Sequence, residues 1–191
     1  LFPYTTLFRS FHEGTARLYT DFSLFTANQE IAGEVAQVFD TVTHMYKRYT
    51  YKHLIVSPHD TRRSLKRLIK AEIEAAQDGK KAEIFFKINN LTDPEMIDQL
   101  YKASQAGVKV RLIIRGMCCL IPGVKGMSDN IKVISIVDRF LEHPRVFVFR
   151  NNGDKLVFIS SADLMPRNLD QRIEVGTPIY DETLKIGRAH V

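Results

Sequence analysis

Strand-like and helix-like segments alternate along the first two thirds of the chain, and this alternation restricts the fold more than any other feature of the sequence. Runs rich in β-branched and aromatic residues, typical of strands, lie at residues 15–25, 51–58, 82–89 and 108–116. Apolar residues three and four positions apart, typical of amphipathic helices, lie between them at residues 28–42, 59–79 and 93–107. This order favours a layered α/β fold. We therefore predict a mixed, largely parallel sheet flanked by helices.

The ends of the predicted helices are marked by residues suited to those positions. Asn28 and Asp93 precede helical segments, where their side chains can accept hydrogen bonds from free backbone N–H groups. Pro94 takes a first helical position, where a missing N–H does no harm. Gly79 and Gly107 end helices, because glycine adopts the left-handed conformation found after a helix without strain.

From Cys118 onward the pattern changes to short strands. A loop containing proline and glycine is followed by strand-like runs at residues 131–137, 145–149, 155–161 and 171–179. The pair Asn152-Gly153 lies between the second and third of these runs and predicts a hairpin turn.

Composition excludes several classes of protein. The longest apolar runs are far shorter than the roughly 20 residues of a membrane-spanning helix, and no secretory signal is recognisable at the start. The formal net charge of +5 favours anionic ligands only weakly. The two cysteines, Cys118 and Cys119, are adjacent and lack the spacing of metal ligands. A reduced, cytoplasmic protein is the simplest interpretation.

The two ends of the sequence fit neither of the neighbouring patterns. Residues 1–10 (LFPYTTLFRS) and 186–191 (IGRAHV) resemble in-frame translations of sequencing adapters. The alternative is a genuine N-terminal strand and a genuine basic tail. With the adapter interpretation, we expect the fold to occupy residues 11–185 and to lack a part that lies upstream.

Polar residues follow two of the predicted strands. Arg115 ends a buried strand, and in open α/β sheets ligands bind beyond the carboxyl ends of strands. Its planar guanidinium suits a phosphate or a carboxylate, although a surface arginine capping the strand is equally compatible. Lys87 and Asn89 end another strand and are weaker candidates for phosphate or ribose contacts.

His143 is the candidate acid–base residue, and Arg145 follows it two positions later. Histidine exchanges protons near neutral pH, but a lone histidine is more often a packed structural residue. Further along, residues 160–163 (SSAD) and Arg167 place hydroxyl and basic groups after an apolar strand. They suit phosphate oxygens, and a polar loop is the alternative.

Four segments together resemble one family. They are TARLYTDFSLFTAN, KINNLTDPEMIDQLYKASQAGVKVRLIIRGMCCLIPG, SDNIKVISIVDRFLEHPRVFVF and ISSADLMPRNLDQRIEVGTPI. In order and spacing they are similar to the C-terminal region of bacterial polyphosphate kinases, from about residue 11 to residue 185. The resemblance implies that residues 11–45 end one C-terminal domain and that residues 46–185 form most of the last one, each with a phospholipase D-like fold.

The resemblance also implies an activity and roles for particular residues. The family transfers the terminal phosphate of ATP reversibly to inorganic polyphosphate through a phosphohistidine, with Mg²⁺. Tyr19 and Arg115 match contacts to nucleotide or phosphate, and His143 matches an assisting histidine. Arg145 and Arg167 remain weaker phosphate candidates. The phosphohistidine and the magnesium site are expected upstream, with no metal ligand in this part.

Partners and location follow from the same resemblance. ATP, ADP and polyphosphate are the expected ligands, and nucleic acid is not. A homo-oligomer in the cytoplasm is expected, with peripheral association with the inner membrane as a further implication.

Two other functions stay open. A phospholipase D-type phosphodiesterase is the first, because the pattern His143-x-Arg145 and Asp163 echo that superfamily. Arginine replaces its usual lysine and aspartate its usual asparagine, which counts against hydrolysis. A non-catalytic polyanion-binding module is the second.

Overall fold

The computed structural model describes residue 14 and residues 17–44 and 46–186. Most of the predicted adapter segments therefore lie outside the described residues. The helices are α3 (Gln29–Thr43), α4 (Thr61–Gln77), α5 (Pro94–Gln105), α6 (Pro166–Asp170) and α7 (Glu182–Ile186), with a 3-10 turn η1 (Asn151–Gly153). The strands are β1 (Tyr19–Thr20), β2 (Ile55–Ser57), β3 (Glu83–Ile88), β4 (Lys109–Ile114), β5 (Ile131–Ile134), β6 (Leu141–Glu142), β7 (Arg145–Phe149), β8 (Leu156–Ser160) and β9 (Glu174–Pro178).

Seven strands form one mixed sheet in the order β2-β9-β8-β7-β3-β4-β5. The α/β class and the mixed sheet are confirmed. The expectation of largely parallel pairing is wrong, because only β3–β4 and β4–β5 pair in parallel and the other four pairings are antiparallel. Parallel neighbours need a crossover connection, which α5 provides between β3 and β4. The short turn at η1 instead joins β7 and β8 as a hairpin, as the pair Asn152-Gly153 predicts.

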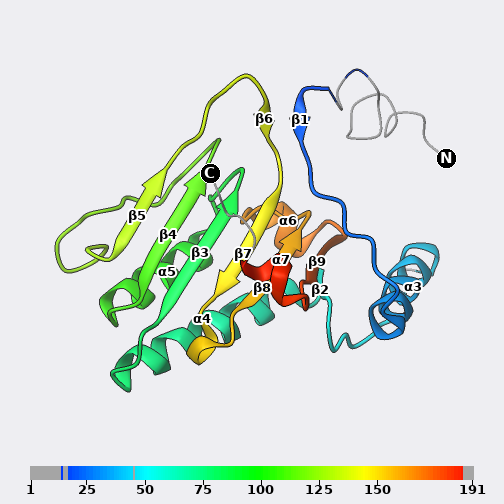
Figure 1. Cartoon of the computed structure of the whole chain (residues 1–191), viewed down its shortest axis with the longest axis horizontal. Helices are drawn as coiled ribbons and strands as arrows, with labels where there is room; N and C mark the ends of the chain where they lie inside the picture. The colour runs from blue at the N-terminus through cyan, green and yellow to red at the C-terminus, as the bar shows by residue number, and fades with distance from the viewer. Residues whose placement is uncertain (1–13, 15–16, 45, 187–191) are drawn as a thin grey trace.

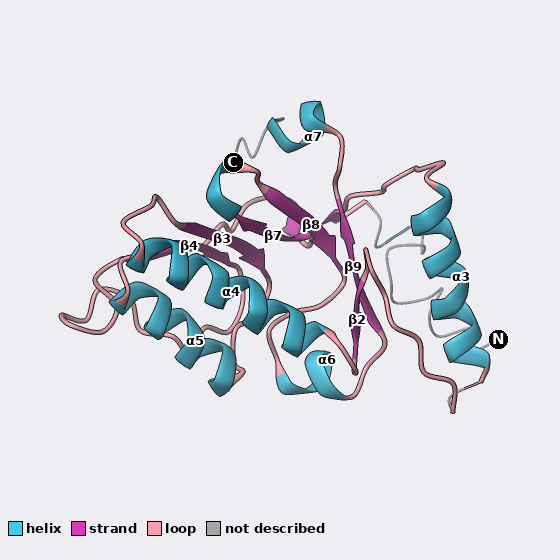
Figure 2. Ribbon diagram, turned by 90° about the horizontal axis from the view of Figure 1, so that it is seen from below, coloured by secondary structure: helices cyan, strands magenta, loops and turns pink. Residues whose placement is uncertain are grey.

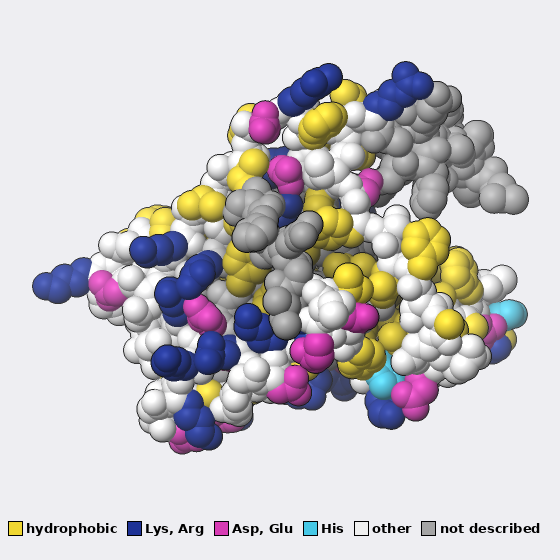
Figure 3. All heavy atoms as spheres, viewed as in Figure 1, with side chains coloured by type: hydrophobic (Ala, Val, Ile, Leu, Met, Phe, Trp, Pro, Cys, Tyr) yellow, Lys and Arg dark blue, Asp and Glu magenta, His cyan; other side chains and the backbone are white. Residues whose placement is uncertain are grey.

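Helices α4 and α5 cover one face of the sheet, and α7 lies on the opposite face (Figures 1 and 2). The core lies between the sheet and helices α4 and α5. Leu65 and Ile69 of α4 and Leu100 of α5 are fully buried with Ile84 and Phe86 of β3. On the other face, Lys and Arg side chains gather over β3, β4 and β5 (Figure 3). Within the described ranges, no helix has the length and apolar content needed to cross a membrane.

The predicted helix ends are confirmed. Asn28 Oδ1 accepts hydrogen bonds from the backbone N–H groups of Glu30 and Ile31, and Asp93 accepts one from Met96. Gly79 and Gly107 follow α4 and α5 with φ of +74° and +93°, the conformation that favours glycine.

The N-terminal part contacts the rest of the described chain at two places, the β2 edge of the main sheet and the separate strand β6. Ile31 and Val38 of α3 pack against Leu54 and Val56, next to β2 and within it. Residues 15 and 16 of the expected strand at 15–25 lie outside the described residues. Within residues 17–25 the strand is limited to β1, whose partner β6 is equally short. The pairing of Tyr19 with Leu141 nevertheless brings the start of the described chain beside His143.

Candidate functional site

The candidate site forms where β3, β4 and β8 end and where β7 begins. Because β7 runs antiparallel to β3 and β8, its first residue lies at their carboxyl ends. The segment that precedes β7 therefore contacts Asn89 after β3, through the His143 carbonyl, and Arg115 after β4, through the Glu142 carbonyl. Asn89 and His143, which are 54 positions apart in the sequence, thus meet at one edge of the sheet.

The His143 ring is held on three sides. Its Nδ1 lies 2.6 Å from Asp21 Oδ1, and its Nε2 lies 3.1 Å from an Arg145 η nitrogen. The ring stacks on Tyr19 with 4.9 Å between centroids. An arginine can only donate, so Nε2 accepts and the proton of neutral His143 sits on Nδ1, facing the carboxylate. Nε2 carries the free lone pair of the ring, and it can take up a proton only after Arg145 releases it.

Arg115 contacts the residue before this histidine, and no described residue bonds to the two terminal nitrogens of its guanidinium. Its Nε donates to the Glu142 carbonyl at 2.6 Å and to Asn89 Oδ1 at 3.2 Å. Among the described residues, Nε is the only nitrogen of the Arg115 side chain that has a hydrogen-bond partner. The two terminal nitrogens form a fork that suits two oxygens of one phosphate.

Lys87 and Asn89 contact the segment that carries His143. The Lys87 ammonium pairs with Glu142 at 2.5 Å, and this lysine is only 8% exposed. The Asn89 amide nitrogen lies 3.5 Å from the His143 carbonyl oxygen, while its Oδ1 accepts from Arg115. Both residues are engaged inside the cluster, so the geometry supports positioning of their neighbours more directly than contact with phosphate.

Arg145 is held by the buried Asp163. Asp163 Oδ1 accepts from Arg145 Nε at 3.2 Å and from the Asn89 backbone N–H at 2.8 Å. Its other oxygen accepts from the Asn90 amide. Asp163 therefore fixes the direction from which Arg145 approaches Nε2 of His143.

The structure places Arg167 apart from the cluster. It lies exposed on α6, which packs against α4 and β2. Among the described residues, its side chain forms no hydrogen bond or ion pair with the cluster. Sequence reasoning missed Asp21 and Glu142. Asp21 stands two positions after Tyr19, and side chains two apart share a face of an extended strand, which is the signal that could have found it.

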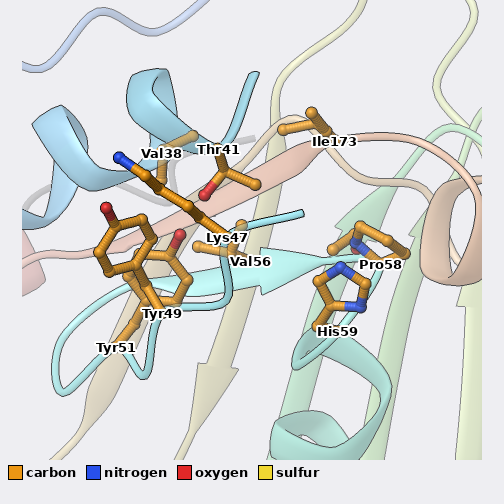
Figure 4. Close-up of a pocket in the computed structure, with 10 residues that line it drawn as sticks. Val38, Thr41, Lys47, Tyr49, Tyr51, Val56, Pro58, His59 and Ile173 are labelled. Carbon is orange, nitrogen blue, oxygen red and sulfur yellow. The ribbon is translucent and has the colours of Figure 1, made fainter. Parts of the chain in front are cut away.

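An open cavity of about 580 Å³ adjoins His143. Tyr19, Asp21, His143 and Arg145 line one side of it, and Ser161 lines it from the end of β8. This volume lies within the range of ligand sites for small molecules of nucleotide size. A second hollow, between α3 and β2 near Tyr49 and Tyr51, measures about 20 Å³ (Figure 4). It holds one water at most, so a nucleotide does not fit there.

The carboxylates around His143 do not fit a magnesium site. Asp21 is bonded to His143, Asp163 to Arg145, and Glu142 to Lys87. Magnesium prefers carboxylates that are free to bind it together with water or phosphate oxygens. Across the residues that the structure describes, no group of three or more histidine, cysteine or acidic side chains could hold a metal ion.

Known proteins resemble this chain over most of its length. A polyphosphate kinase from Vibrio cholerae is 59% identical over 176 residues, which are 92% of this chain and 25% of that relative. The crystal structure of polyphosphate kinase from Porphyromonas gingivalis superposes with a TM-score of 0.88 at 43% identity, covering 92% of this chain and 27% of the other. NucT from Helicobacter pylori shares the fold alone, with a TM-score of 0.50 at 20% identity, covering 70% of this chain and 86% of the other.

The chain thus spans about a quarter of the length of the curated relatives it matches. Two family models match it in succession. Polyphosphate kinase C-terminal domain 1 covers residues 7–48, and polyphosphate kinase C-terminal domain 2 covers residues 54–189. Because the second model alone matches more than half of the sequence, the chain belongs to the polyphosphate kinase family.

Proposed function

We propose that this chain is the His143-bearing part of an ATP:polyphosphate phosphotransferase, which reversibly transfers the terminal phosphate of ATP to inorganic polyphosphate. One observation carries the proposal: the Asp21–His143 pair, stacked on Tyr19 and flanked by Arg145, at a cavity of about 580 Å³. A histidine that can exchange a proton, beside arginines that neutralise charge, suits transfer between phosphate oxygens.

The residues divide the work by their chemistry. Asp21 holds the Nδ1 proton of His143 and stabilises the cation that forms when Nε2 takes up a second proton. Arg115 and Arg145 neutralise negative charge on the transferred group or on its neighbouring phosphates, which is the main task in phosphoryl transfer. Tyr19 supplies a flat aromatic face at the rim of the cavity. The histidine that carries the phosphoryl group is expected elsewhere in the longer family protein.

Several finer expectations belong to the same proposal. Magnesium would accompany ATP and neutralise its phosphates, and its protein ligands are expected outside this chain. Homo-oligomerisation of the longer protein, a cytoplasmic location and peripheral association with the inner membrane follow from the family resemblance. The division into residues 11–45 and 46–185 also stays a prediction, as do phosphate contacts by Lys87, Asn89 and Arg167.

A phosphodiesterase of the phospholipase D type is less well supported. Its histidine motif uses a lysine where Arg145 stands, and Arg145 is bound to the buried Asp163. Similarity to NucT shows the fold and carries no activity to this chain. A purely binding module would not need a carboxylate 2.6 Å from a histidine nitrogen.

The decisive experiment exchanges the matched segment of the Vibrio cholerae polyphosphate kinase for the matching segment of this chain. We expect this chimera to convert ATP to polyphosphate and to lose that activity with His143→Ala. A folded chimera that hydrolyses phosphodiesters, or that makes polyphosphate equally well without His143, would overturn the proposal. Circular dichroism and thermal unfolding of both proteins show whether they are folded.

A further inference from the structure

Asn90 follows β3 and joins two segments that come from other strands. Its side-chain nitrogen donates to Asp163 Oδ2 at 2.9 Å, in the segment after β8. Its side-chain oxygen accepts from the Met117 backbone N–H at 3.0 Å, in the loop after β4. A carboxamide has one acceptor oxygen and one donor nitrogen, so it serves a carboxylate and a backbone N–H at the same time. We call Asn90 with these two hydrogen bonds the Asn90 bridge.

Each of the two joined segments holds one arginine of the candidate site. Arg115 stands two positions before Met117 in the loop after β4. On the other side, Asp163 accepts from Arg145 Nε at 3.2 Å. The Asn90 bridge therefore connects the backbone that carries Arg115 to the carboxylate that orients Arg145.

The backbone around Asn90 leaves this side chain little room to move. The Gly116 N–H donates to the Asn89 carbonyl at 2.7 Å. A Cβ added at Gly116 would lie 2.6 Å from Asn90 Oδ1 and 2.9 Å from the Asn89 carbonyl oxygen, closer than real Cβ atoms approach such oxygens. From the other side, the Leu164 N–H donates to the Asn90 carbonyl at 3.1 Å. The loop after β4 and the segment after β8 thus hold Asn90 between them.

The carboxylate of Asp163 depends on this bridge. Asp163 is only 4% exposed. Its Oδ1 accepts from Arg145 and from the Asn89 backbone N–H, whereas Asn90 gives Oδ2 its one hydrogen bond from a described residue. A buried charged oxygen without a donor is costly, so loss of the Asn90 donor favours rotation of the carboxylate. Arg145, which is bonded to the same carboxylate, would then move with it.

We propose that Asn90 is a positioning residue, which sets the separation between the guanidinium groups of Arg115 and Arg145 so that both reach neighbouring phosphate groups of one substrate. Asn90 does not contact the substrate in this role, because both ends of its amide are engaged within the protein. This role rests on the proposed function. Groups that neutralise charge in a transition state act only in the correct geometry, and a misplacement of about 1 Å can lower the rate by about 10²-fold.

An exchange of the two bonded side chains tests this role. Asn90→Asp places two carboxylates against each other without a donor, and Asp163→Asn places two amide nitrogens against each other. In the double variant, the amide at position 163 can donate to the carboxylate at position 90, while its oxygen still accepts from Arg145. The carboxylate at position 90 still accepts from the Met117 N–H. The double variant therefore keeps the net charge and restores the bridge.

The kinetic test is made in the chimera at about pH 7.5, well above the ordinary pKa of aspartate. We expect each single substitution to lower kcat by at least about tenfold, with a smaller change in KM for ATP. The double variant should recover most of that loss. Asn152→Asp is the matched control, because it makes the same chemical change at an exposed position in η1 and should leave kcat unchanged. A folded Asn90→Asp chimera with unaltered kcat would overturn the proposal, and so would a double variant no faster than the slower single one.

A second measurement needs no reaction. Exchange of the Arg145 Nε–H with water is measured by NMR on the 191-residue chain, with thermal unfolding to verify that each variant folds. We expect this exchange to be at least about threefold faster with Asn90→Asp and to slow again in the double variant. A merely structural role would lower the unfolding temperature and leave both this exchange and kcat unchanged, which would also refute the proposal. An inactive parent chimera would count against the proposed function alone, because the exchange of Arg145 tests the positioning by itself.

Discussion

At the scale of single residues, the site depends on a pairing that joins distant parts of the chain. Thr20 Oγ1 accepts a hydrogen bond from the His143 backbone N–H across 123 positions of sequence, and Asp21 follows Thr20 directly. Sequence patterns pointed to His143, Arg145 and Arg115 as separate candidates, and the family resemblance added Tyr19. They could not show that Asp21 meets His143, because a two-residue strand pair leaves almost no periodic signal.

His143→Ala tests the acid–base role directly. Removing a group that exchanges protons in the transition state typically lowers the rate by about 10² to 10⁴-fold, and we expect a loss of that size in kcat/KM of the chimera. His143 is only partly buried, so folding should be nearly unaffected. Polyphosphate synthesis and thermal unfolding are the measurements. An unaltered rate of synthesis would show that His143 has a structural role and does not exchange protons in the reaction.

Asp21→Asn tests the tautomer argument. The amide can still bond to the ring but cannot stabilise a charged imidazolium, so we expect kcat to fall by more than about tenfold while KM for ATP changes little. A merely structural role of Asp21 would instead lower the unfolding temperature and leave kcat of the folded chimera unchanged.

At the scale of elements, one arginine joins three helices at their ends. Arg62 in the first turn of α4 pairs with Asp93, which caps α5, with Glu95 in the first turn of α5, and with Asp170 of α6. The cap at Asp93 was predictable from the local sequence. The ion pair of Asp93 with Arg62 was not predictable, because ion pairs between helices depend on how the helices pack.

Arg62→Leu should therefore destabilise the fold. Asp93 is 2% exposed, and removing the partner of a buried carboxylate costs roughly 3 kcal/mol. Arg63→Ala is the matched control, since Arg63 is 77% exposed and pairs only with Asp60 among the described residues. Its expected cost is below about 1 kcal/mol. Urea unfolding of the wild type and the two variants measures both losses of stability. Equal unfolding free energies for Arg62→Leu and Arg63→Ala would contradict the role of Arg62 in joining the helices.

The same cluster predicts a pH dependence. The pKa of Glu95 is lowered, first by the hydrogen bond from Lys66 and then by the one from Arg62. A carboxyl with a depressed folded pKa adds stability that is present above its unfolded pKa and lost as the pH falls through the folded one. The difference in unfolding free energy between the wild type and Glu95→Gln should therefore shrink as the pH falls below the ordinary glutamate value of 4.5. A constant difference across that range would show that the ionised form contributes nothing.

At the scale of the whole molecule, alternating periodicity predicted the layers but not the order of strands. The pattern of strand, helix and strand that forms β3, α5 and β4 predicted an α/β fold, and that prediction is correct. The antiparallel half was underestimated, because pairings such as β3 with β7 join segments about 60 residues apart and follow from packing alone.

The last prediction concerns the 191-residue chain by itself. Its relatives are about four times longer, and only the C-terminal domain models match it. It offers His143, the free fork of Arg115 and an open cavity, but the family's phosphohistidine is expected outside it. We expect weak binding of ATP and polyphosphate, and no incorporation of labelled phosphate from ATP into polyphosphate, under conditions in which the chimera is active. Strong synthesis by this chain alone would mean that the transfer needs no second histidine, and His143 would then have to act as the nucleophile through Nε2.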